Sequence, residues 1–590
     1  MRVFKISMLG VVLLALAVGT SEQAGLAQAG CSIMVKPGES IQRAIDAAKE
    51  GAVICLTAGM WEENVEIKKS LTLRGAGREQ TKIKGKKEDE PVIMIASDAE
   101  IEVTIEGLAA AEAKGYREGI EVAGKARVTI TNSQISGNEG DGIHMVDSAQ
   151  ATISNSQISG NESAGIFIDY STRVTITNSQ ISGNKGMGIN MGISAQATIS
   201  NSQISSNGKL GIWMWSSTQA TITNSQISGN EWDGIGMVGS AQATISNSQI
   251  SGNGYNGIEM WESAQATISN SQISGNKGGG IDIGGSAQAT IENNTIQENK
   301  MCGIWSSSDK PAQGKGNRMR GNGADLCGNA PAGLRIPLVP PTTKTQLSFP
   351  GPYPTLQEAI DALAPGGVIT IAAGEHLGGL TIWKPLTLRG AGREEVKFMG
   401  AVSLISEAQG VQIEGVTITG SAFTGLLLGG QAKATITNSQ VSGNKGGGIG
   451  VGGSAQATIT NSQISGNGYT GIWMWGSAQA EIRGSTIEGN GTSEDCKKNN
   501  YICNGIWLYA KSQVKIIDST IRNNADWGVG AYLKQCGEYT DDFTGTVTFE
   551  DMMLDQIAGN NTSGNQNGMG NPGNHYWNRP DIPDGQVCLP

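Results

Sequence analysis

The stretch from Gly142 to Asn161 reads GIHMVDSAQATISNSQISGN, and this unit decides the fold because the chain repeats it. Apolar and polar residues alternate over 143–146, over 151–154 and around Ile158, as expected of short β-strands with one buried face. Asn155 follows the second strand, where asparagine tolerates the left-handed backbone conformation of a sharp bend. One unit therefore predicts one coil of three strands. Its expected inward residues are Ile143, Met145, Ala151, Ile153 and Ile158.

The asparagine of the motifs TNSQ, SNSQ and ENNT recurs at one constant interval along the first half of the chain. Its positions are Asn132, Asn155, Asn178, Asn201, Asn224, Asn247, Asn270 and Asn293. A period of this length is typical of a stacked solenoid, in which no repeat can bury its apolar face alone. Stacking in register places each strand about 4.8 Å from its copy and predicts a hydrogen-bonded ladder of these asparagines. The sequence thus predicts an all-β parallel β-helix.

The chain divides into two such units. An amphipathic helix is expected at 40–48, and a second at 355–363 begins with the capping box Thr355–Glu358. Each helix would cover the exposed strand edges at the start of a solenoid. We expect a signal peptide over 1–29, a first β-helix over 30–328, a proline-bearing linker over 329–345, and a second β-helix with an irregular tail over 346–590.

Composition and the N-terminus indicate the compartment. The net charge of −11, without a long basic run, argues against nucleic acid or an anionic membrane as partner. Basic residues, an apolar run from Ile6 to Gly19 and the small-x-small triplet at 27–29 predict a cleaved signal peptide. We therefore expect an exported protein, extracellular, on the cell surface or in the periplasm, and no later segment is long and apolar enough to span a membrane.

Eight cysteines in an exported chain indicate disulfides. Their clustering favours four local pairs: Cys31 with Cys55, Cys302 with Cys327, Cys496 with Cys503, and Cys536 with Cys588.

Two segments open the units alike, VICLTAGMWEENVEIKKSLTLRGAGRE at 53–79 and VITIAAGEHLGGLTIWKPLTLRGAGRE at 368–394. With the glycine-separated coils that follow, they resemble the pectin-lyase-like right-handed β-helix superfamily, particularly its NosD-like parallel β-helix repeat proteins. The resemblance implies a right-handed coil and an association with carbohydrate binding and cleavage. The catalytic signatures of the superfamily's polygalacturonases, pectin methylesterases and mannuronan epimerases are missing, which lowers the expectation of an enzyme. Whether the protein is an enzyme stays uncertain.

Aromatic residues gather in the outward positions that follow each Gly-Ile pair. The phrase GIWMW occurs at 211–215 and again at 471–475, and seven of the twelve tryptophans fall in these columns. Flat indole rings in line can stack on the apolar faces of sugars, so we predict binding of a polysaccharide or cell-surface glycan. The alternative is that the rings pack on a covering loop or on the other unit. The expected binding residues are Trp213, Trp215, Trp261, Trp305, Trp473, Trp475, Trp507, Asp169 and His144.

Glu259 and Asp282 occupy the same outward column on successive coils. Their carboxylates would lie about 5 Å apart, a spacing suited to the catalytic pair of a retaining glycosidase or to a calcium site. Adjacent carboxylates also arise easily in an acidic repeat protein, without any catalytic role. Polysaccharide binding therefore remains the leading prediction, and polysaccharide cleavage by this pair is the alternative. The inward methionine column predicts packing rather than a metal site. A rigid surface spacer, and more remotely ice binding by the Thr-x-Thr strands, are the other functions considered.

Overall fold

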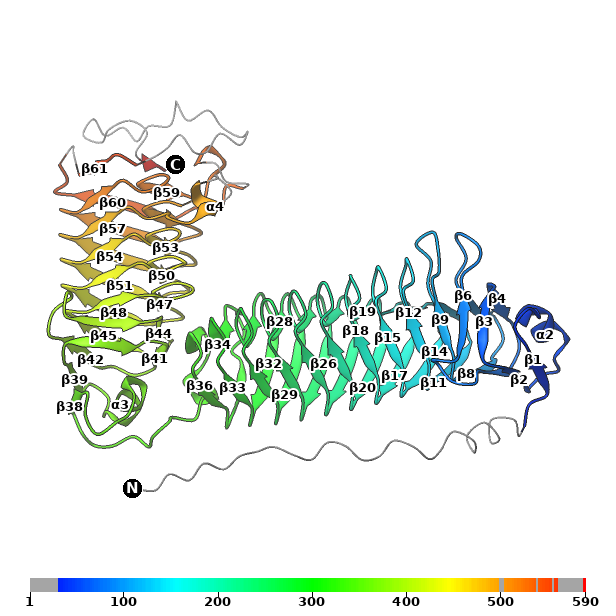
Figure 1. The fold of residues 1–590 in the computed structure, drawn as a ribbon. Coiled ribbons are helices and arrows are strands. Elements are labelled where there is room, and N and C mark those ends of the chain that lie inside the picture. Colours follow the sequence, from blue (N-terminus) through cyan, green and yellow to red (C-terminus); the bar gives the residue numbers. More distant parts are fainter. Residues whose placement is uncertain (1–29, 498–502, 537–539, 554–555, 561–586, 590) are drawn as a thin grey trace, which may run out of the picture.

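The computed structural model describes residues 30–497, 503–536, 540–553, 556–560 and 587–589. Two β-solenoids stand at an angle to one another and give the molecule the shape of an L (Figure 1). Over the described residues, the first unit holds parallel sheets of 13, 12 and 12 strands, and the second holds parallel sheets of 9, 8 and 8 strands. The predicted signal peptide and most of the irregular tail lie outside the described residues.

One coil shows how the sequence builds each turn of the solenoid. Its strands are β13 (Ile143–Met145), β14 (Gln150–Ser154) and β15 (Gln157–Ser159), which confirms the three predicted strands. Each pairs in parallel with its counterpart on the next coil, so that Ile143 faces Ile166 and Ile153 faces Ile176. The inward residues Ile143, Met145, Ile153 and Ile158 have no exposed surface, and the methionine column belongs to the core as predicted.

The sheet formed by the Gly-Ile strands is called the Trp sheet of each unit. The first Trp sheet consists of β4 (Val65–Ile67), β7 (Ile93–Ser97), β10 (Ile120–Gly124), β13, β16 (Ile166–Ile168), β19 (Ile189–Met191), β22 (Ile212–Met214), β25 (Ile235–Met237), β28 (Ile258–Met260), β31 (Ile281–Ile283), β34 (Cys302–Ser306) and β37 (Ala324–Gly328). The second consists of β41 (Leu380–Ile382), β44 (Val402–Leu404), β47 (Leu426–Leu428), β50 (Ile449–Val451), β53 (Ile472–Met474), β56 (Ile506–Leu508), β59 (Val529–Ala531) and β62 (Val587–Cys588).

The other two sheets of the first unit run from β1 (Ile33–Val35) to β35 (Gln313–Lys315) and from β3 (Gly59–Glu62) to β36 (Arg318–Arg320). Those of the second unit run from β38 (Gln346–Phe349) to β60 (Thr546–Glu550) and from β40 (Gly374–Leu377) to β61 (Ile557–Ala558). Their outward residues, mainly Gln, Thr and Ser, change little from coil to coil in the regular part of the stack.

The hydrogen-bonded asparagine ladder was predicted at the asparagines of the NSQ turns, but the structure forms it at another asparagine of each coil. The NSQ asparagines do adopt the left-handed conformation, with φ of 50° at Asn155 and 49° at Asn178, but that conformation turns the Asn155 side chain outward. The buried ladder is made by the asparagine at the next corner of each coil, mostly within Ser-Gly-Asn, whose Nδ2 donates to Oδ1 of the following one over 2.8–3.0 Å. It includes Asn138, Asn161, Asn184, Asn207, Asn230, Asn253, Asn276 and Asn299.

Short helices lie near the start of both units. Helix α2 (Ile41–Ala47) packs against β1 and β4, and α3 (Leu356–Ala362) packs against β38 and β41. Thr355 and Glu358 form the predicted capping box. A one-turn helix, α4 (Glu494–Lys497), begins the insertion in the second unit, and 3₁₀ turns span Ala332–Leu334 and Lys534–Cys536. None of the described helices is long and apolar enough to cross a membrane.

All four predicted disulfides are present: Cys31–Cys55, Cys302–Cys327, Cys496–Cys503 and Cys536–Cys588. Disulfides persist in oxidising compartments, so four of them indicate an extracytoplasmic location.

The two units meet through a buried ion-pair network. β37, the last strand of the first Trp sheet, packs against β41, β44 and β47 of the second. Arg335 lies in the segment predicted to be a linker, and its Nε donates a hydrogen bond to Asp325 Oδ2 at 2.6 Å. Its Nη1 and Nη2 donate to the two carboxylate oxygens of Asp361 at 2.9 and 2.8 Å. The three side chains are at most 6% exposed. Because breaking a buried ion pair leaves a charge without a partner, this network holds the junction in one geometry.

Candidate functional site

Five indole rings of the Trp sheets lie over glycines of the neighbouring coil. A Cβ added to Gly236 would meet Cε3 and Cζ3 of Trp213 at 2.7 and 2.8 Å, and one added to Gly284 would meet three ring atoms of Trp261 at 2.6–2.8 Å. Three consecutive ring atoms of Trp261 at such similar distances mean that this ring lies flat over Gly284, and the same holds for Trp475 over Gly452. The other three rings contact their glycine through two neighbouring ring atoms. We call these glycines the glycine seats. The pairs are Trp213 with Gly236, Trp215 with Gly192, Trp261 with Gly284, Trp473 with Gly450, and Trp475 with Gly452.

The seats were missed from the sequence, although a signal for them exists. Each seat occupies the same outward column as its tryptophan, on the coil directly before or after it. A glycine there provides the space in which one ring face can approach the backbone.

Hydrogen bonds fix two of these rings. Trp215 Nε1 donates to Asn190 Oδ1 at 3.2 Å, and Trp261 Nε1 donates to Glu259 Oε1 at 3.1 Å. Trp261 is 42% exposed, while Trp213 and Trp215 are half-buried. The rings are therefore held in place while part of their surface remains in contact with solvent.

Three predicted binding tryptophans contribute to the junction between the units. Trp305 contacts Phe423 of the second unit edge to face, with ring centroids 5.8 Å apart. Trp473 and Trp475 stack on each other at 4.2 Å, and all three pack against a small apolar cluster of Cys302, Ala324, Cys327 and Leu427. Packing on the other unit, the alternative raised from the sequence, thus describes Trp305, and Trp473 and Trp475 take part in the same junction through a cluster that includes first-unit residues.

The remaining predicted residues are spread along the two sheets. Trp507 lies beside Tyr532, with ring centroids 5.8 Å apart. Asp169 was expected to point into solvent but is only 7% exposed. Its Oδ1 accepts a hydrogen bond from the backbone N–H of Tyr170 at 2.9 Å and lies, like the ring of Trp215, beside Gly192. His144 lies on β13, five strands from β28, and stacks on Phe167 at 4.9 Å.

Glu259 and Asp282 are brought together with a third carboxylate, Asp233. Glu259 on β28 is the direct register partner of Asp282 on β31. Asp233 precedes β25, and its Oδ1 accepts a hydrogen bond from the backbone N–H of Asn256 at 2.7 Å. The alternation rule did not find Asp233 because this residue lies in a turn rather than in an outward strand column.

Burial and repulsion between the carboxylates raise the pKa of Asp282 and of Asp233. Burial, then the charges of Glu259 and Asp233, raise the pKa of Asp282 from 3.8 to about 7. Burial, then the charge of Glu259, raise the pKa of Asp233 from 3.8 to about 7. Oδ1 of Asp282 is buried and has no hydrogen-bond partner among the described residues. Carboxyl groups that hold a proton near neutral pH can act as general acids.

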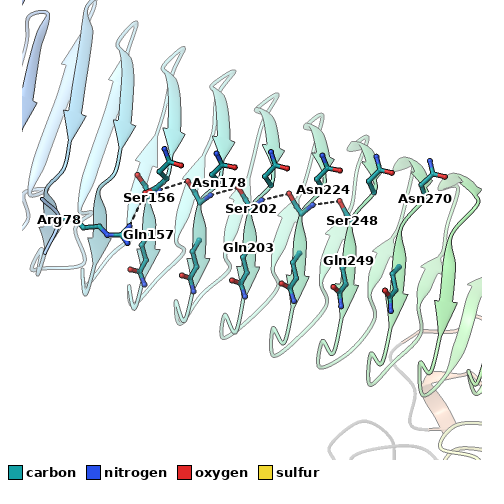
Figure 2. Close-up of a pocket in the computed structure, with 18 residues that line it drawn as sticks. Arg78, Ser156, Gln157, Asn178, Ser202, Gln203, Asn224, Ser248, Gln249 and Asn270 are labelled. Carbon is teal, nitrogen blue, oxygen red and sulfur yellow. Dashed lines mark hydrogen bonds between the residues drawn. The ribbon is translucent and has the colours of Figure 1, made fainter. Parts of the chain in front are cut away.

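A long open groove follows the NSQ turns, away from these residues. Figure 2 shows its repeating lining, with Asn178, Asn224 and Asn270 in one row and Gln157 and Gln203 in another. Arg78 lies at one end, and its Nη1 donates to the carbonyl of Asn155 at 3.5 Å. The groove is polar, and none of the predicted site residues lines it.

These coils match a known family. The family described as "Right handed beta helix region" matches residues 92–219, 210–332 and 400–569. The chain therefore belongs to the right-handed β-helix family, which confirms the right-handed coil that the resemblance implied. No curated protein matches the chain.

Solved structures with a similar fold include enzymes that act on polysaccharides. The A-module of the Azotobacter vinelandii mannuronan C-5 epimerase AlgE4 is 21% identical, with a TM-score of 0.43, over 49% of this chain and 93% of that chain. Pectate lyase Pel9A is 16% identical, with a TM-score of 0.35, over 46% of this chain and 80% of that chain. The catalytic domain of a GH87 alpha-1,3-glucanase in complex with nigerose is 14% identical, with a TM-score of 0.33, over 52% of this chain and 69% of that chain. The likeness concerns the fold alone.

Proposed function

We propose that the protein binds a polysaccharide along the first Trp sheet, with sugar rings stacked on Trp213, Trp215 and Trp261. The observation that carries this proposal is the set of glycine seats. A ring whose one face lies on the backbone offers its other face to a ligand, and a sugar can bury its C–H surface there while its hydroxyls stay in water. Trp213 and Trp261 lie two strands apart, roughly 10 Å, so one oligosaccharide can reach both.

Immobilised rings also favour affinity. A side chain that is already ordered loses little conformational entropy when a ligand arrives, and the entropy lost in ordering flexible side chains is a main cost of binding. The hydrogen bonds of Trp215 and Trp261 keep their rings in place before any ligand binds.

The test is a glycan panel probed with the mature protein and matched tryptophan variants. Trp213→Ala and Trp261→Ala should each weaken binding to the best glycan about tenfold, since a central aromatic contact contributes more than about 1 kcal/mol. Trp232→Ala is the control, because Trp232 is 47% exposed but lies in the turn before β25 and has no glycine seat. Equal loss in Trp261→Ala and Trp232→Ala, or no loss in any variant, would contradict the proposal.

Cleavage of the bound chain is a second candidate, favoured by the protonated carboxyl groups beside Trp261. In this scheme Asp282 donates a proton to the leaving oxygen and Glu259 acts as the nucleophile, at the short separation typical of a retaining glycosidase. Asp233 would help Asp282 to keep its proton. A calcium ion between the same carboxylates is the alternative, and it predicts glycan binding that a chelator abolishes.

Product analysis on any glycan that binds tests cleavage. Glu259→Gln and Asp282→Asn should each remove activity while leaving glycan binding largely intact. Glu231→Gln is the control, because Glu231 is an exposed acidic residue in the turn next to Asp233. If the wild type binds a glycan but releases no product, the protein is a binding module and cleavage is excluded.

We also propose that α2 and α3 close the first ends of two tandem units, 30–328 and 346–590, joined by residues 329–345. The helices bury apolar residues against the first strands, as a cap must: Ile41 and Ile45 in α2, Leu356 and Ile360 in α3. A chain that begins at Pro365 lacks β38 and α3 and should aggregate through its uncovered strand edges, while one that begins at residue 330 keeps both and stays monomeric. Equal solubility of the two would contradict the capping role.

A further inference from the structure

A second cluster of ionisable side chains lies on the first Trp sheet, away from the three carboxylates described above. It consists of Glu118, Asp141 and His144, and one ligand atom of each lies within 4.8 Å of the other two. The cluster combines an imidazole with two carboxylates, so it differs from the purely acidic group around Glu259.

Each of the three side chains is held by the coil that carries it. His144 points outward from the middle of β13, and its ring stacks on Phe167 of the next strand with an interplanar angle of 2°. Asp141 lies in the turn before β13, where its Oδ1 accepts the backbone N–H of Ala164 at 2.7 Å. Glu118 lies in the turn before β10. Stacking and hydrogen bonding therefore orient the donors before any ligand arrives.

Glu118 is an unusual buried carboxylate. It is only 7% exposed, and its Oε2 is buried without a hydrogen-bond partner among the described residues. Arg117 Nε lies 3.2 Å from Oε2 as an ion pair, and His144 Nδ1 lies 3.6 Å from Oε1, beyond hydrogen-bonding distance. Arg117 and His144 therefore compensate part of the charge of this buried carboxylate, and a cation bound between Glu118, Asp141 and His144 would add to that compensation.

We propose that Glu118, Asp141 and His144 bind one divalent transition-metal ion, for which Zn²⁺ is the probe. Imidazole and carboxylate together suit zinc and its neighbours, whereas calcium prefers oxygen donors only. Zinc bonds of about 2.0–2.2 Å place neighbouring ligand atoms roughly 3.3 Å apart, so small side-chain rotations close the present spacing.

The surroundings suit this assignment. Arg117 contacts two carboxylates, Glu118 Oε2 through Nε at 3.2 Å and Glu121 Oε2 through Nη2 at 2.5 Å, so its single charge offsets one of the three carboxylates around the site. Two carboxylates remain to neutralise a divalent ion. Three protein ligands leave a fourth position for water or another ligand. The proposal stands independently of glycan binding.

The test is zinc binding by the mature, tag-free protein after dialysis against a chelator. Isothermal titration and elemental analysis should give one zinc per chain, with no comparable calcium binding. All eight cysteines are in disulfides, so thiolates cannot account for the zinc. His144→Ala and Glu118→Gln should each weaken zinc binding at least about tenfold, the lower limit for damage to a metal site.

Asp147→Asn is the matched control, because it removes a nearby negative charge from the same coil and should keep wild-type zinc affinity. Cobalt substitution of the wild type adds a second readout, since its visible spectrum reports nitrogen and oxygen ligands without any mutation. If His144→Ala fails to fold, zinc binding by the near-isosteric Glu118→Gln and the cobalt spectrum of the wild type still test the proposal. A wild type without one tight zinc, or variants that bind as the wild type does, would overturn the proposal.

Discussion

The shifted pKa of Asp282 predicts how stability depends on pH. Its pKa rises from 3.8 to about 7 on folding, first because of burial and then because of the charges of Glu259 and Asp233. Between these two values the folded protein keeps a proton that the unfolded chain has already released. Stability from this group is therefore full below about pH 4, falls as the pH rises, and is lost above about pH 7.

The size of the effect follows from the shift. Each pKa unit corresponds to about 1.36 kcal/mol, so a rise of about three units amounts to about 4 kcal/mol between pH 4 and pH 8. This value is an upper limit, because the side chain keeps some contact with solvent. Asp282→Asn is neutral at every pH and similar in shape, so it should be more stable than the wild type at pH 8 and about equal to it at pH 4.

Urea unfolding at pH 4.5, 6 and 8 measures this difference, and the fluorescence of the nearby Trp261 and Trp305 reports on the surrounding coils. The wild type should lose several kcal/mol relative to Asp282→Asn across this range. Ser286→Ala, a neutral change on the adjacent turn, is the control and should follow the wild type. If Asp282→Asn and the wild type show parallel pH profiles, Asp282 is ionised normally in the folded protein and the reasoning about its proton is refuted.

Three further substitutions test the ladder, the junction and the glycine seats. Asn230→Ala removes the buried ladder oxygen that accepts from the backbone N–H and Nδ2 of Asn207, so it should cost about 2–5 kcal/mol in urea unfolding, against about 1–2 kcal/mol for Asn224→Ala at a left-handed turn. Arg335→Met leaves two buried carboxylates without their partner, and should cost about 3–5 kcal/mol and expose the junction to protease. Gly284→Ala should push Trp261 from its seat and lower glycan affinity as Trp261→Ala does, with little change in the urea midpoint.

The strands and the disulfides could be predicted because they depend on local rules. Alternation repeated with a fixed period assigns each side chain a direction, and the structure buries Ile143 and Met145 and leaves Trp261 exposed accordingly. The cysteines pair within short segments of the stack, so proximity in sequence was enough to find Cys302–Cys327 and its three counterparts.

The turns could not be predicted in the same way. Two asparagines recur in every regular coil with the same period, and only the backbone conformation decides that Asn161 points inward while Asn155 points outward. Asp233 and Glu118 precede their strands, where alternation gives no direction. Both complete clusters whose other members the sequence had partly identified, Glu259 with Asp282 in one and His144 in the other.

Different positions of a coil have different structural roles, and this explains why the variable residues gather on the Trp sheet. Ile and Met side chains fill the core, and the asparagine ladder, together with a similar ladder of serines at the NSQ turns, links each coil to the next. The outward column of the Trp sheet takes no part in either, so its residues can differ between coils at little cost to folding. An indole can approach the backbone of the adjacent coil only where that coil offers a glycine, and the pairs Trp213 with Gly236 and Trp261 with Gly284 meet this condition. The seats therefore restrict where an aromatic platform can exist on a stack whose strands lie about 4.8 Å apart. The proposed binding surface thus depends on a tryptophan and a glycine on successive coils of one column, not on the tryptophans alone.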